Sequence, residues 1–133
     1  METLKAGCFL KDKANGKICL IYRDKHDDYS FPKGHLEKGE TLIECAVRET
    51  AEECKRIAVI DNGIAPYIED YVNKYGEKCR VYMYFAVDGG ASDNDSEDTH
   101  EVVWTDIEDV EAKLSFDSLI NMWRDVLPIV KAL

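Results

Sequence analysis

The sequence is short of positive charge and has no long apolar run. Its 133 residues hold 17 Lys and Arg against 27 Asp and Glu, so the formal net charge is -10. A general nucleic-acid binder needs a basic face to neutralise phosphates, and duplex nucleic acid is therefore not an expected partner. No apolar stretch approaches the 18 residues of a membrane-spanning helix, and the first residues lack the pattern of a signal peptide. We expect no membrane association.

A disulfide framework is also missing from the pattern. The cysteines are odd in number and form no CxxC pair: Cys8, Cys19, Cys45, Cys54 and Cys79. Free thiols of this kind are typical of a reducing compartment, which predicts a cytoplasmic protein. The length predicts one domain over residues 1–133, and the 45% hydrophobic content is ordinary for a chain that buries a core.

Strands are predicted where β-branched and aromatic residues lie between turn signals. The predicted strands are residues 4–10, 17–23, 57–60, 64–72, 78–87 and 101–105, with a hairpin turn at 14–16. Residues 81–87 are apolar or aromatic throughout, which suits a strand covered on both faces. Residues 24–39 and 89–99 are polar and rich in turn-forming residues, and they are predicted to be loops.

Two helices are predicted. The first follows Thr41, which forms a capping-box pattern with Glu44, and it runs to about Lys55. The second begins after Ser115, has apolar residues at helical spacing, and should kink or stop near Pro128. Together with the strands, these helices predict an α/β sandwich in which a mixed sheet is flanked by a central and a C-terminal helix.

Three carboxylates lie close together on the first predicted helix. At about 100° per residue, Glu49, Glu52 and Glu53 fall within an arc of roughly 100°. The residues expected to face the sheet lie on another arc: Ile43, Val47, Thr50 and Cys54. Carboxylates spaced in this way repel one another by a few tenths of a kcal/mol per pair. The cluster is either a solvated acidic face or a set of hard oxygen ligands for Mg²⁺ or Mn²⁺.

Arg48 precedes this cluster. Its guanidinium lies far enough round the helix to reach the preceding loop and to hold Glu40 in a bidentate pair. An ordinary surface pair with Glu44 or Glu52 is the alternative on spacing alone.

From Gly34 onward, the residues resemble the Nudix box, G-x5-E-x7-R-E-U-x-E-E-x-G-U. Gly34, Glu40 and the run Arg48-Glu49-Thr50-Ala51-Glu52-Glu53 occupy its positions at the required spacing. Two positions depart from the pattern, because Lys55 replaces a glycine and Arg56 replaces an apolar residue. Both lie at the helix exit, where glycine normally allows a left-handed cap, so a slightly longer helix is expected. No carboxylate of the box is missing.

The resemblance implies the family's α/β/α sandwich and the hydrolysis of nucleoside diphosphates linked to another group, with Mg²⁺ or Mn²⁺ as cofactor. It implies Glu49 and Glu53 as the main metal ligands and Glu52 as the base or a further metal contact. Glu40 and Arg48 would support the catalytic helix, and the Gly34 backbone would approach the metal or the substrate.

A further metal ligand is expected from a loop late in the chain. The candidates are Glu97, Asp98 and Glu101, of which Glu101 is the assigned ligand; the alternative is that they only solubilise the loop.

The residues before the box bear on the substrate. The sequence Phe-Pro-Lys-Gly-His at 31–35 is similar to that of dinucleoside tetraphosphate hydrolases and diphosphoinositol polyphosphate phosphohydrolases. Few cations lie nearby, which disfavours the densely anionic inositol pyrophosphates. We expect Lys33, Gly34 and His35 to contact a polyphosphate, and Tyr82 and Tyr84 to stack on purine rings unless they pack in the sheet. Diadenosine tetraphosphate, cleaved to ATP and AMP, is the first candidate.

Other functions stay open. The enzymatic alternatives are a pyrophosphatase acting on normal or oxidised nucleoside triphosphates and a pyrophosphohydrolase acting on the 5′-triphosphate of RNA. A nucleotide-sensing binding module is the main non-enzymatic alternative, although such modules typically lose a box acid that this chain keeps. An acidic structural protein would not explain the Pro-Lys-Gly loop. The expected partner is a small nucleotide polyphosphate, and both a monomer and a homodimer are compatible with the sequence.

Overall fold

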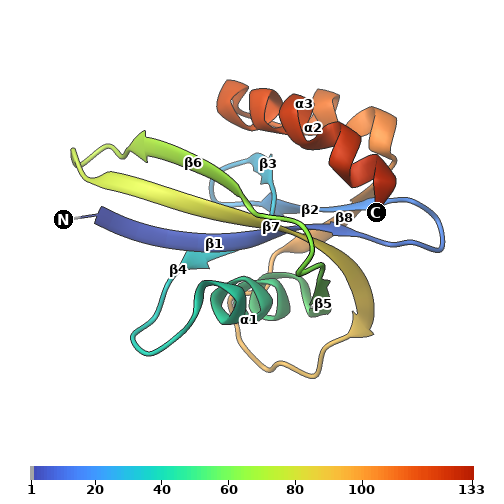
Figure 1. The fold of residues 1–133 in the computed structure, drawn as a ribbon, viewed down its shortest axis with the longest axis horizontal. Coiled ribbons are helices and arrows are strands. Elements are labelled where there is room, and N and C mark those ends of the chain that lie inside the picture. Colours follow the sequence, from blue (N-terminus) through green and yellow to red (C-terminus); the bar gives the residue numbers. More distant parts are fainter. Residues whose placement is uncertain (1) are drawn as a thin grey trace.

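The computed structural model describes residues 2–133, in which four strands precede the first helix, four follow it, and two helices end the chain (Figure 1). The strands are β1 (Glu2–Lys11), β2 (Ile18–Arg23), β3 (Asp28–Ser30), β4 (Lys33–His35), β5 (Arg56–Ile60), β6 (Tyr67–Val72), β7 (Lys78–Ala91) and β8 (Glu101–Thr105). The helices are α1 (Leu42–Cys54), α2 (Val110–Lys113) and α3 (Asp117–Ala132), and a 3₁₀ turn covers Ile107–Asp109.

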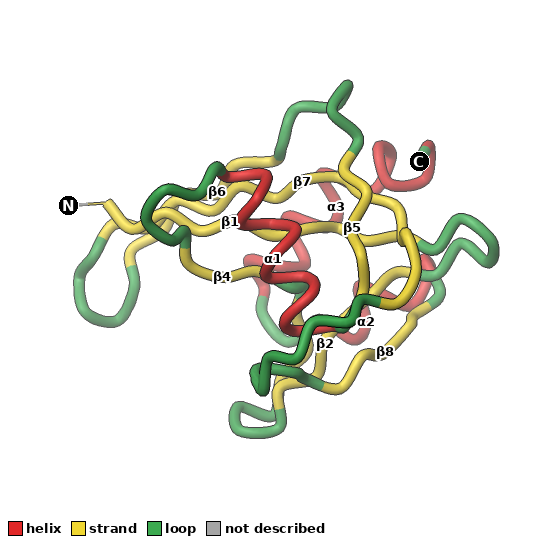
Figure 2. Tube along the Cα trace, turned by 90° about the horizontal axis from the view of Figure 1, so that it is seen from below, coloured by secondary structure: helices red, strands yellow, loops and turns green. Residues whose placement is uncertain are grey.

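The strands form one mixed sheet built around the parallel pair β1 and β7. The order β3-β2-β1-β7-β5 is completed by β4 beside β1, β6 beside β7 and β8 beside β2. All of these pairs are antiparallel except β1–β7. Figure 1 shows α1 on one face of the sheet and α2 and α3 on the other. Figure 2 shows α1 lying across the sheet face that it covers. The predicted α/β sandwich is confirmed.

Both faces of β1 and β7 are buried, which explains their apolar sequences. Phe9 and Phe85 are paired across the two strands and belong to the core under α3, together with Trp123. The alternate residues Cys8 and Tyr84 belong to a second core under α1. Since successive side chains of a strand point to opposite faces, the continuous apolar run at 81–87 serves two cores at once, as predicted.

α1 begins where the capping box places it. The Thr41 hydroxyl accepts a hydrogen bond from the Glu44 amide at 3.1 Å, and the Glu44 carboxylate accepts one from the Thr41 amide at 2.9 Å. The prediction that Ile43 faces the sheet is wrong, because its side chain is 40% exposed. The buried residues of α1 are Cys45, Ala46, Thr50 and Cys54. These small side chains let the helix lie close to the sheet.

Some predicted boundaries need correction. The predicted loop at 24–39 contains β3 and β4, and β7 extends through Gly89 to Ala91. The strand predicted at 64–72 begins only at Tyr67, and α2 was not predicted. α3 does not stop at Pro128, which is exposed on the helix surface. Pro128 has no amide hydrogen to donate to the Arg124 carbonyl. Because Arg124 is exposed, water can hydrogen-bond to this carbonyl instead.

None of the helices within residues 2–133 has the length and apolar character needed to cross a lipid bilayer.

Candidate active site

The Pro-Lys-Gly segment is held against β1 beside the catalytic helix. In the register of β1 and β4, Gly7 lies opposite Lys33, and the Cys8 amide donates to the Pro32 carbonyl at 3.2 Å. A Cβ atom at Gly7 would overlap the Pro32 carbonyl oxygen and the Lys33 side chain. The glycine in β1 therefore allows this segment to cross the sheet and to bring Gly34 against α1.

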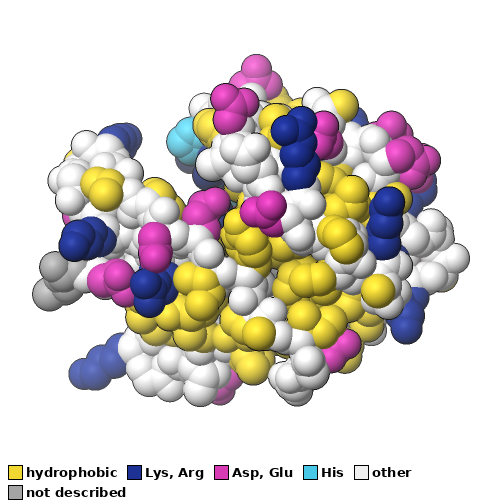
Figure 3. All heavy atoms as spheres, turned by 45° about the horizontal axis from the view of Figure 1, so that its top comes forward, with side chains coloured by type: hydrophobic (Ala, Val, Ile, Leu, Met, Phe, Trp, Pro, Cys, Tyr) yellow, Lys and Arg dark blue, Asp and Glu magenta, His cyan; other side chains and the backbone are white. Residues whose placement is uncertain are grey.

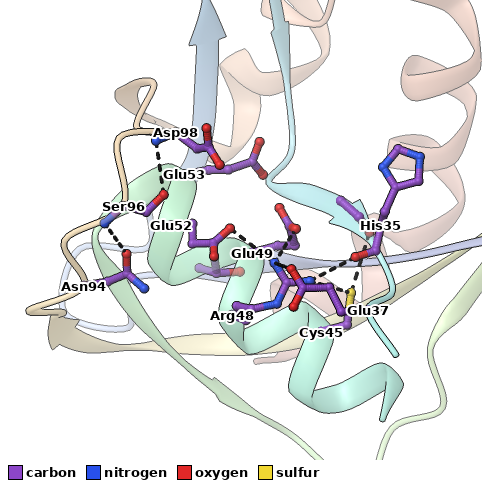
Figure 4. A network of polar contacts seen from close by, with 12 residues as sticks. His35, Glu37, Cys45, Arg48, Glu49, Glu52, Glu53, Asn94, Ser96 and Asp98 are labelled. Atoms are coloured by element: carbon purple, nitrogen blue, oxygen red, sulfur yellow. Dashed lines mark hydrogen bonds and ion pairs between the residues drawn. The ribbon is translucent and has the colours of Figure 1, made fainter. Parts of the chain in front are cut away.

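Arg48 gathers the acidic residues around it into one network (Figure 4). Its Nε and Nη2 atoms donate to the two oxygens of Glu40 at 2.6 and 3.0 Å, which confirms the bidentate pair. Nη1 donates to Glu49 at 2.7 Å and to Glu52 at 3.2 Å, and Nη2 also donates to the His35 carbonyl at 2.9 Å. The same guanidinium thus fixes the preceding loop and orients two carboxylates of α1.

Gly34 lies directly against the Glu49 carboxylate. A Cβ atom at this position would overlap the carboxyl carbon and both oxygens of Glu49. The Cys45 thiol donates to the Gly34 carbonyl at 3.6 Å, which holds the backbone in place on α1. The glycine that begins the motif therefore leaves room for a carboxylate, in addition to the backbone approach expected from the sequence.

We predict that Gly34→Ala displaces Glu49 and lowers its affinity for a divalent cation by about tenfold, as loss of a supporting contact typically does. The fold should be kept, since β4 has only three residues. Mn²⁺ titration followed by electron paramagnetic resonance measures the affinity. Gly39→Ala is a poor control because its φ is +81°, whereas Gly63→Ala meets only one atom at 3.2 Å and should bind Mn²⁺ normally.

Glu53 is the most enclosed of the three carboxylates that the sequence analysis singled out. One carboxyl oxygen accepts the Lys33 amide at 2.8 Å, and the other lies 3.5 Å from Nε2 of His100. Burial, reinforced by the charge of Glu49, raises the pKa of the Glu53 carboxyl to about 8. Burial also raises the pKa of Glu49. In both groups the effect of burial outweighs that of the nearby positive charges, which are Arg48 for Glu49 and Lys33 and Arg23 for Glu53.

The donor set fits a hard divalent cation. Arg48 lies within 4.0 Å of four carboxylates, those of Glu37, Glu40, Glu49 and Glu52. The single positive charge of its guanidinium cannot neutralise their four negative charges. Among residues 2–133, no three acidic, His or Cys side chains are already arranged as a metal-binding group. Mg²⁺ typically keeps several waters and takes only one or two carboxylates from the protein, so this partial set is the kind it uses.

A cleft of about 780 Å³ leads away from Glu53 between the β6–β7 hairpin and the start of α3 (Figure 3). We call it the long cleft. It is lined by Lys5, Ile21, Arg23, Ser30, Phe31, Lys33, Gly34, His35, Glu53, Glu69, Asp70, Tyr71, Val72, Asn73, Lys74, Phe116, Ser118 and Leu119. The structure thus places the three predicted substrate contacts of β4 in one wall of the cleft.

The cations of the long cleft are held by specific partners. Arg23 forms a bidentate pair with Asp28 at 2.7 and 2.6 Å, and Lys5 donates to the Tyr71 hydroxyl at 2.9 Å. Burial lowers the pKa of Lys33, and it raises the pKa of Glu69. A phosphate group in the cleft would favour the charged form of the lysine.

The two tyrosines assigned to base stacking do not line the long cleft. Tyr84 is 8% exposed and belongs to the core under α1, and Tyr82 packs against that core. Their alternation on β7 directs both toward α1, whereas the cleft opens on the other side of the sheet. The assignment of Tyr84 is therefore wrong, and the aromatic side chains that do line the cleft include Tyr71 and Phe116.

A second, smaller hollow of about 390 Å³ adjoins the carboxylates, and we call it the side hollow. It is lined by Arg23, Asp24, Lys25, His26, Glu49, Glu53, Glu97, Asp98, Thr99 and His100. Glu101 is not among these residues; it is exposed on β8, where it pairs with Tyr22. Of the three late-loop candidates, Glu97 and Asp98 thus line the hollow beside Glu49 and Glu53, and a ligand role for Glu101 stays a prediction.

Sequence reasoning missed Arg23 and His100. Arg23 lies at the end of a predicted strand and lines both the long cleft and the side hollow. Its only sequence signal is an acidic residue five positions later. His100 has no signal in the sequence, because its place beside Glu53 depends on how the late loop folds back on α1. Glu52 is held by Arg48 and lines neither the cleft nor the hollow.

Comparisons with known proteins show which family the chain resembles. The family model of the NUDIX domain matches residues 1–122. An 8-oxo-(d)GTP phosphatase of Mycolicibacterium smegmatis is 30% identical over 95 residues, which are 71% of this chain and 29% of that protein. An mRNA-decapping enzyme subunit 2 of Saccharomyces cerevisiae is 33% identical over 76 residues, which are 55% of this chain and 7% of that protein. The chain thus spans less than a third of either relative.

Solved structures share the fold. A NUDIX hydrolase from Nitrosomonas europaea superposes with a TM-score of 0.79 at 18% identity, covering 96% of this chain and 90% of that one. A binary complex of the C. elegans Ap4A hydrolase superposes with a TM-score of 0.77 at 20% identity, covering 98% of this chain and 99% of that one. At these identities the superpositions establish the architecture.

Proposed function

The chain belongs to the Nudix hydrolase family, and from this premise we propose that it hydrolyses a phosphoanhydride of a dinucleoside polyphosphate, with diadenosine tetraphosphate as the first candidate. Hydrolase relatives support the class of pyrophosphohydrolase. The observation that carries the proposal is a set of three cations, Arg23, Lys33 and Lys5, that line the long cleft together with Glu53. Several cations in one cleft suit a chain of several phosphates rather than a single one.

The cofactor of this proposal is Mg²⁺ or Mn²⁺. Glu49 and Glu53 are the residues that would hold it, with Asp98 or Glu97 as the contribution of the late loop. When bound, the ion would polarise a phosphoryl oxygen and lower the pKa of a coordinated water. The side chains of the chain supply the remaining functions: they bind the phosphates, orient them and accept a proton.

The cations of the cleft orient the polyphosphate. Arg23 is fixed by its bidentate pair with Asp28, so it presents the rest of its guanidinium to the junction of the two hollows. Lys33 follows Pro32 and acts as a point charge close to Glu53, whose carboxylate accepts its amide. His35, at the exposed end of β4, would contact a phosphate farther from the scissile bond.

Phe116 and Tyr71, rather than the tyrosines of β7, are the proposed stacking partners of the base. Both line the long cleft, and Phe116 is 46% exposed at the start of α3. An exposed aromatic ring in a cleft with several cations is suited to stacking on a purine. One nucleoside would thus rest at the mouth of the cleft while its phosphates extend toward Glu53.

The proton of the attacking water needs an acceptor, and we keep Glu52 in this role. It lies on the same face of α1 as Glu49 and is oriented by Arg48 at 3.2 Å. Hydrolysis breaks one P–O–P bond, adds the water oxygen to the attacked phosphorus and yields ATP and AMP. Glu52→Gln should lower kcat more than it lowers metal affinity.

A second candidate substrate is an oxidised purine nucleoside triphosphate. The 8-oxo-(d)GTP phosphatase of M. smegmatis, 30% identical over 71% of this chain, favours it. A triphosphate would contact the same cations but would leave part of the long cleft empty.

Steady-state kinetics with Mg²⁺ distinguish these substrates. The panel contains diadenosine tetraphosphate, ATP, GTP, 8-oxo-dGTP and an RNA with a 5′-triphosphate, and products are separated by ion-exchange chromatography. We expect ATP and AMP from diadenosine tetraphosphate, with the highest kcat/KM of the panel. A preference for 8-oxo-dGTP would establish the second candidate, and no turnover of any substrate would favour a binding module.

The stacking role has its own test. Phe116→Ala should raise KM for diadenosine tetraphosphate about tenfold, which corresponds to the loss of one base–aromatic stack, and should leave kcat nearly unchanged. Ile129→Ala, which removes an exposed apolar side chain from α3, the helix that begins directly after Phe116, is the matched control. Equal KM values for the two variants would contradict the proposed position of the base.

A further inference from the structure

The loop between β7 and β8, residues 92–100, closes the C-terminal end of α1. The last carbonyl groups of a helix have no partner within the helix. Here the His100 amide donates to the Glu53 carbonyl at 3.0 Å, and the Thr99 hydroxyl donates to the Glu52 carbonyl at 3.3 Å. The Ser92 amide donates to the Lys55 carbonyl at 3.0 Å. The loop is thus attached to the helix that carries the catalytic carboxylates.

Lys55 occupies the position where the family pattern has a glycine. The helix ends at Cys54, so the expected extension of α1 is wrong, and Lys55 itself adopts the left-handed conformation with φ 55° and ψ 38°. This conformation is strained for a residue with a Cβ atom, and a glycine would avoid the strain.

The lysine side chain reaches into the loop. Its Nζ atom donates to the Ser96 carbonyl at 2.5 Å and lies 3.5 Å from the Asn94 side-chain oxygen. Asn94 in turn accepts the Ser96 amide at 2.9 Å, and the Ser96 hydroxyl accepts the Asp98 amide at 3.1 Å. One ammonium group therefore fixes a chain of turns that leads directly to Asp98, and Figure 4 shows these turns beside α1.

The residues that follow this anchor face the carboxylates. Glu97, Asp98 and His100 line the side hollow together with Glu49 and Glu53. The His100 ring lies 3.5 Å from the Glu53 carboxylate. Any shift of the loop would move these side chains relative to the residues that would hold a cation.

We propose that Lys55 is a positioning residue: by holding the loop 92–100 against the end of α1, it places Asp98 and His100 beside Glu49 and Glu53 and so sets the affinity of this face for a divalent cation. The inference rests on the proposed function in so far as that function uses such a cation. Lys55 itself lines neither the long cleft nor the side hollow.

Substitution of Lys55 separates its backbone role from its side-chain role. Lys55→Gly restores the glycine of the family pattern, relieves the left-handed conformation and removes the ammonium. Lys55→Asn tolerates the same conformation without a long cationic side chain, and Lys55→Arg keeps a cation of similar reach. Lys131→Ala removes an exposed lysine from α3 and serves as the charge-matched control.

Three measurements apply to each protein after treatment with EDTA: thermal unfolding, hydrogen exchange of the amides in 92–100, and Mn²⁺ titration by electron paramagnetic resonance. We expect Lys55→Gly to unfold no earlier than the parent but to bind Mn²⁺ about tenfold more weakly, the size of effect typical of residues that orient metal ligands. Exchange should quicken at Ser96 and Asp98. Lys55→Asn should behave like the glycine variant, while Lys55→Arg should restore the affinity and Lys131→Ala should leave it unchanged.

Parental Mn²⁺ affinity in Lys55→Gly and Lys55→Asn would overturn the inference, even if exchange in the loop quickened. An equal loss in Lys55→Arg would overturn it as well, because the cation would then not be what matters. If the parent protein bound no Mn²⁺, the proposed cofactor would fail and the metal part of the inference with it. A parent that binds Mn²⁺ but cleaves no dinucleoside polyphosphate would refute the proposed substrate alone.

Discussion

Replacing Arg48 with alanine is expected to lower the free energy of unfolding by about 3 kcal/mol and kcat/KM by about 100-fold. The guanidinium is 20% exposed and contacts the carboxylates of Glu40, Glu49 and Glu52. Its loss would leave these groups next to one another without a counter-charge, and would release the loop that carries Gly34. Urea unfolding measures the first effect, and steady-state kinetics measure the second.

Two further variants show whether the geometry of Arg48 matters. Arg48→Lys keeps the charge but cannot form the two parallel hydrogen bonds to Glu40, so it should recover only part of the stability. Arg124→Ala breaks a bidentate pair with Glu111 in which both side chains are largely exposed, and should cost less than about 1 kcal/mol. Equal losses in Arg48→Ala and Arg124→Ala would contradict the central place of Arg48.

Glu53→Gln should lower kcat by about three orders of magnitude while the fold is kept. Three orders of magnitude correspond to ~4 kcal/mol of transition-state stabilisation, which a metal ion typically supplies. The glutamine oxygen still accepts the Lys33 amide, which at present donates to Glu53 at 2.8 Å. Activity with saturating Mg²⁺, measured beside thermal unfolding in EDTA, separates the chemical effect from the structural one.

The same variant has a signature in the pH dependence of stability. Burial raises the pKa of Glu53 from 4.5 to about 8 in the folded protein, so the folded state binds this proton more tightly than the unfolded state does. Without metal, the group therefore removes stability progressively as pH rises from about 4.5 to 8. In EDTA, Glu53→Gln should lose less stability than the parent across this range. A steeper loss in the variant would contradict the buried position of the carboxylate.

Local patterns predicted the parts of the fold that short-range physics controls. The capping box at Thr41 places the start of α1 because its two hydrogen bonds lie within four residues of one another. The apolar run of β7 indicates burial on two faces, which only a central strand has. The spacing of Glu49, Glu52 and Glu53 predicts one side of α1 because all three lie within about one turn of the helix.

Contacts between distant segments were not predictable in this way. β3 and β4 have three residues each, too few for a pattern, and they form by pairing with β2 and β1. Nothing in residues 92–100 indicates that His100 rather than Glu101 faces Glu53, because that depends on hydrogen bonds to the end of α1. Alternation along β7 predicts that Tyr82 and Tyr84 lie on the same face of the sheet. Only the position of α1 shows that this face is covered.

The most direct test of the account is cleavage of diadenosine tetraphosphate by EDTA-treated protein before and after Mg²⁺ is added, with the products resolved by ion-exchange chromatography. The account predicts no product in EDTA, ATP and AMP in equal amounts once Mg²⁺ is present, and no recovery in Glu53→Gln. Equal cleavage with and without Mg²⁺, or cleavage by Glu53→Gln at the parental rate, would contradict the assignment of the α1 carboxylates as the metal-binding face.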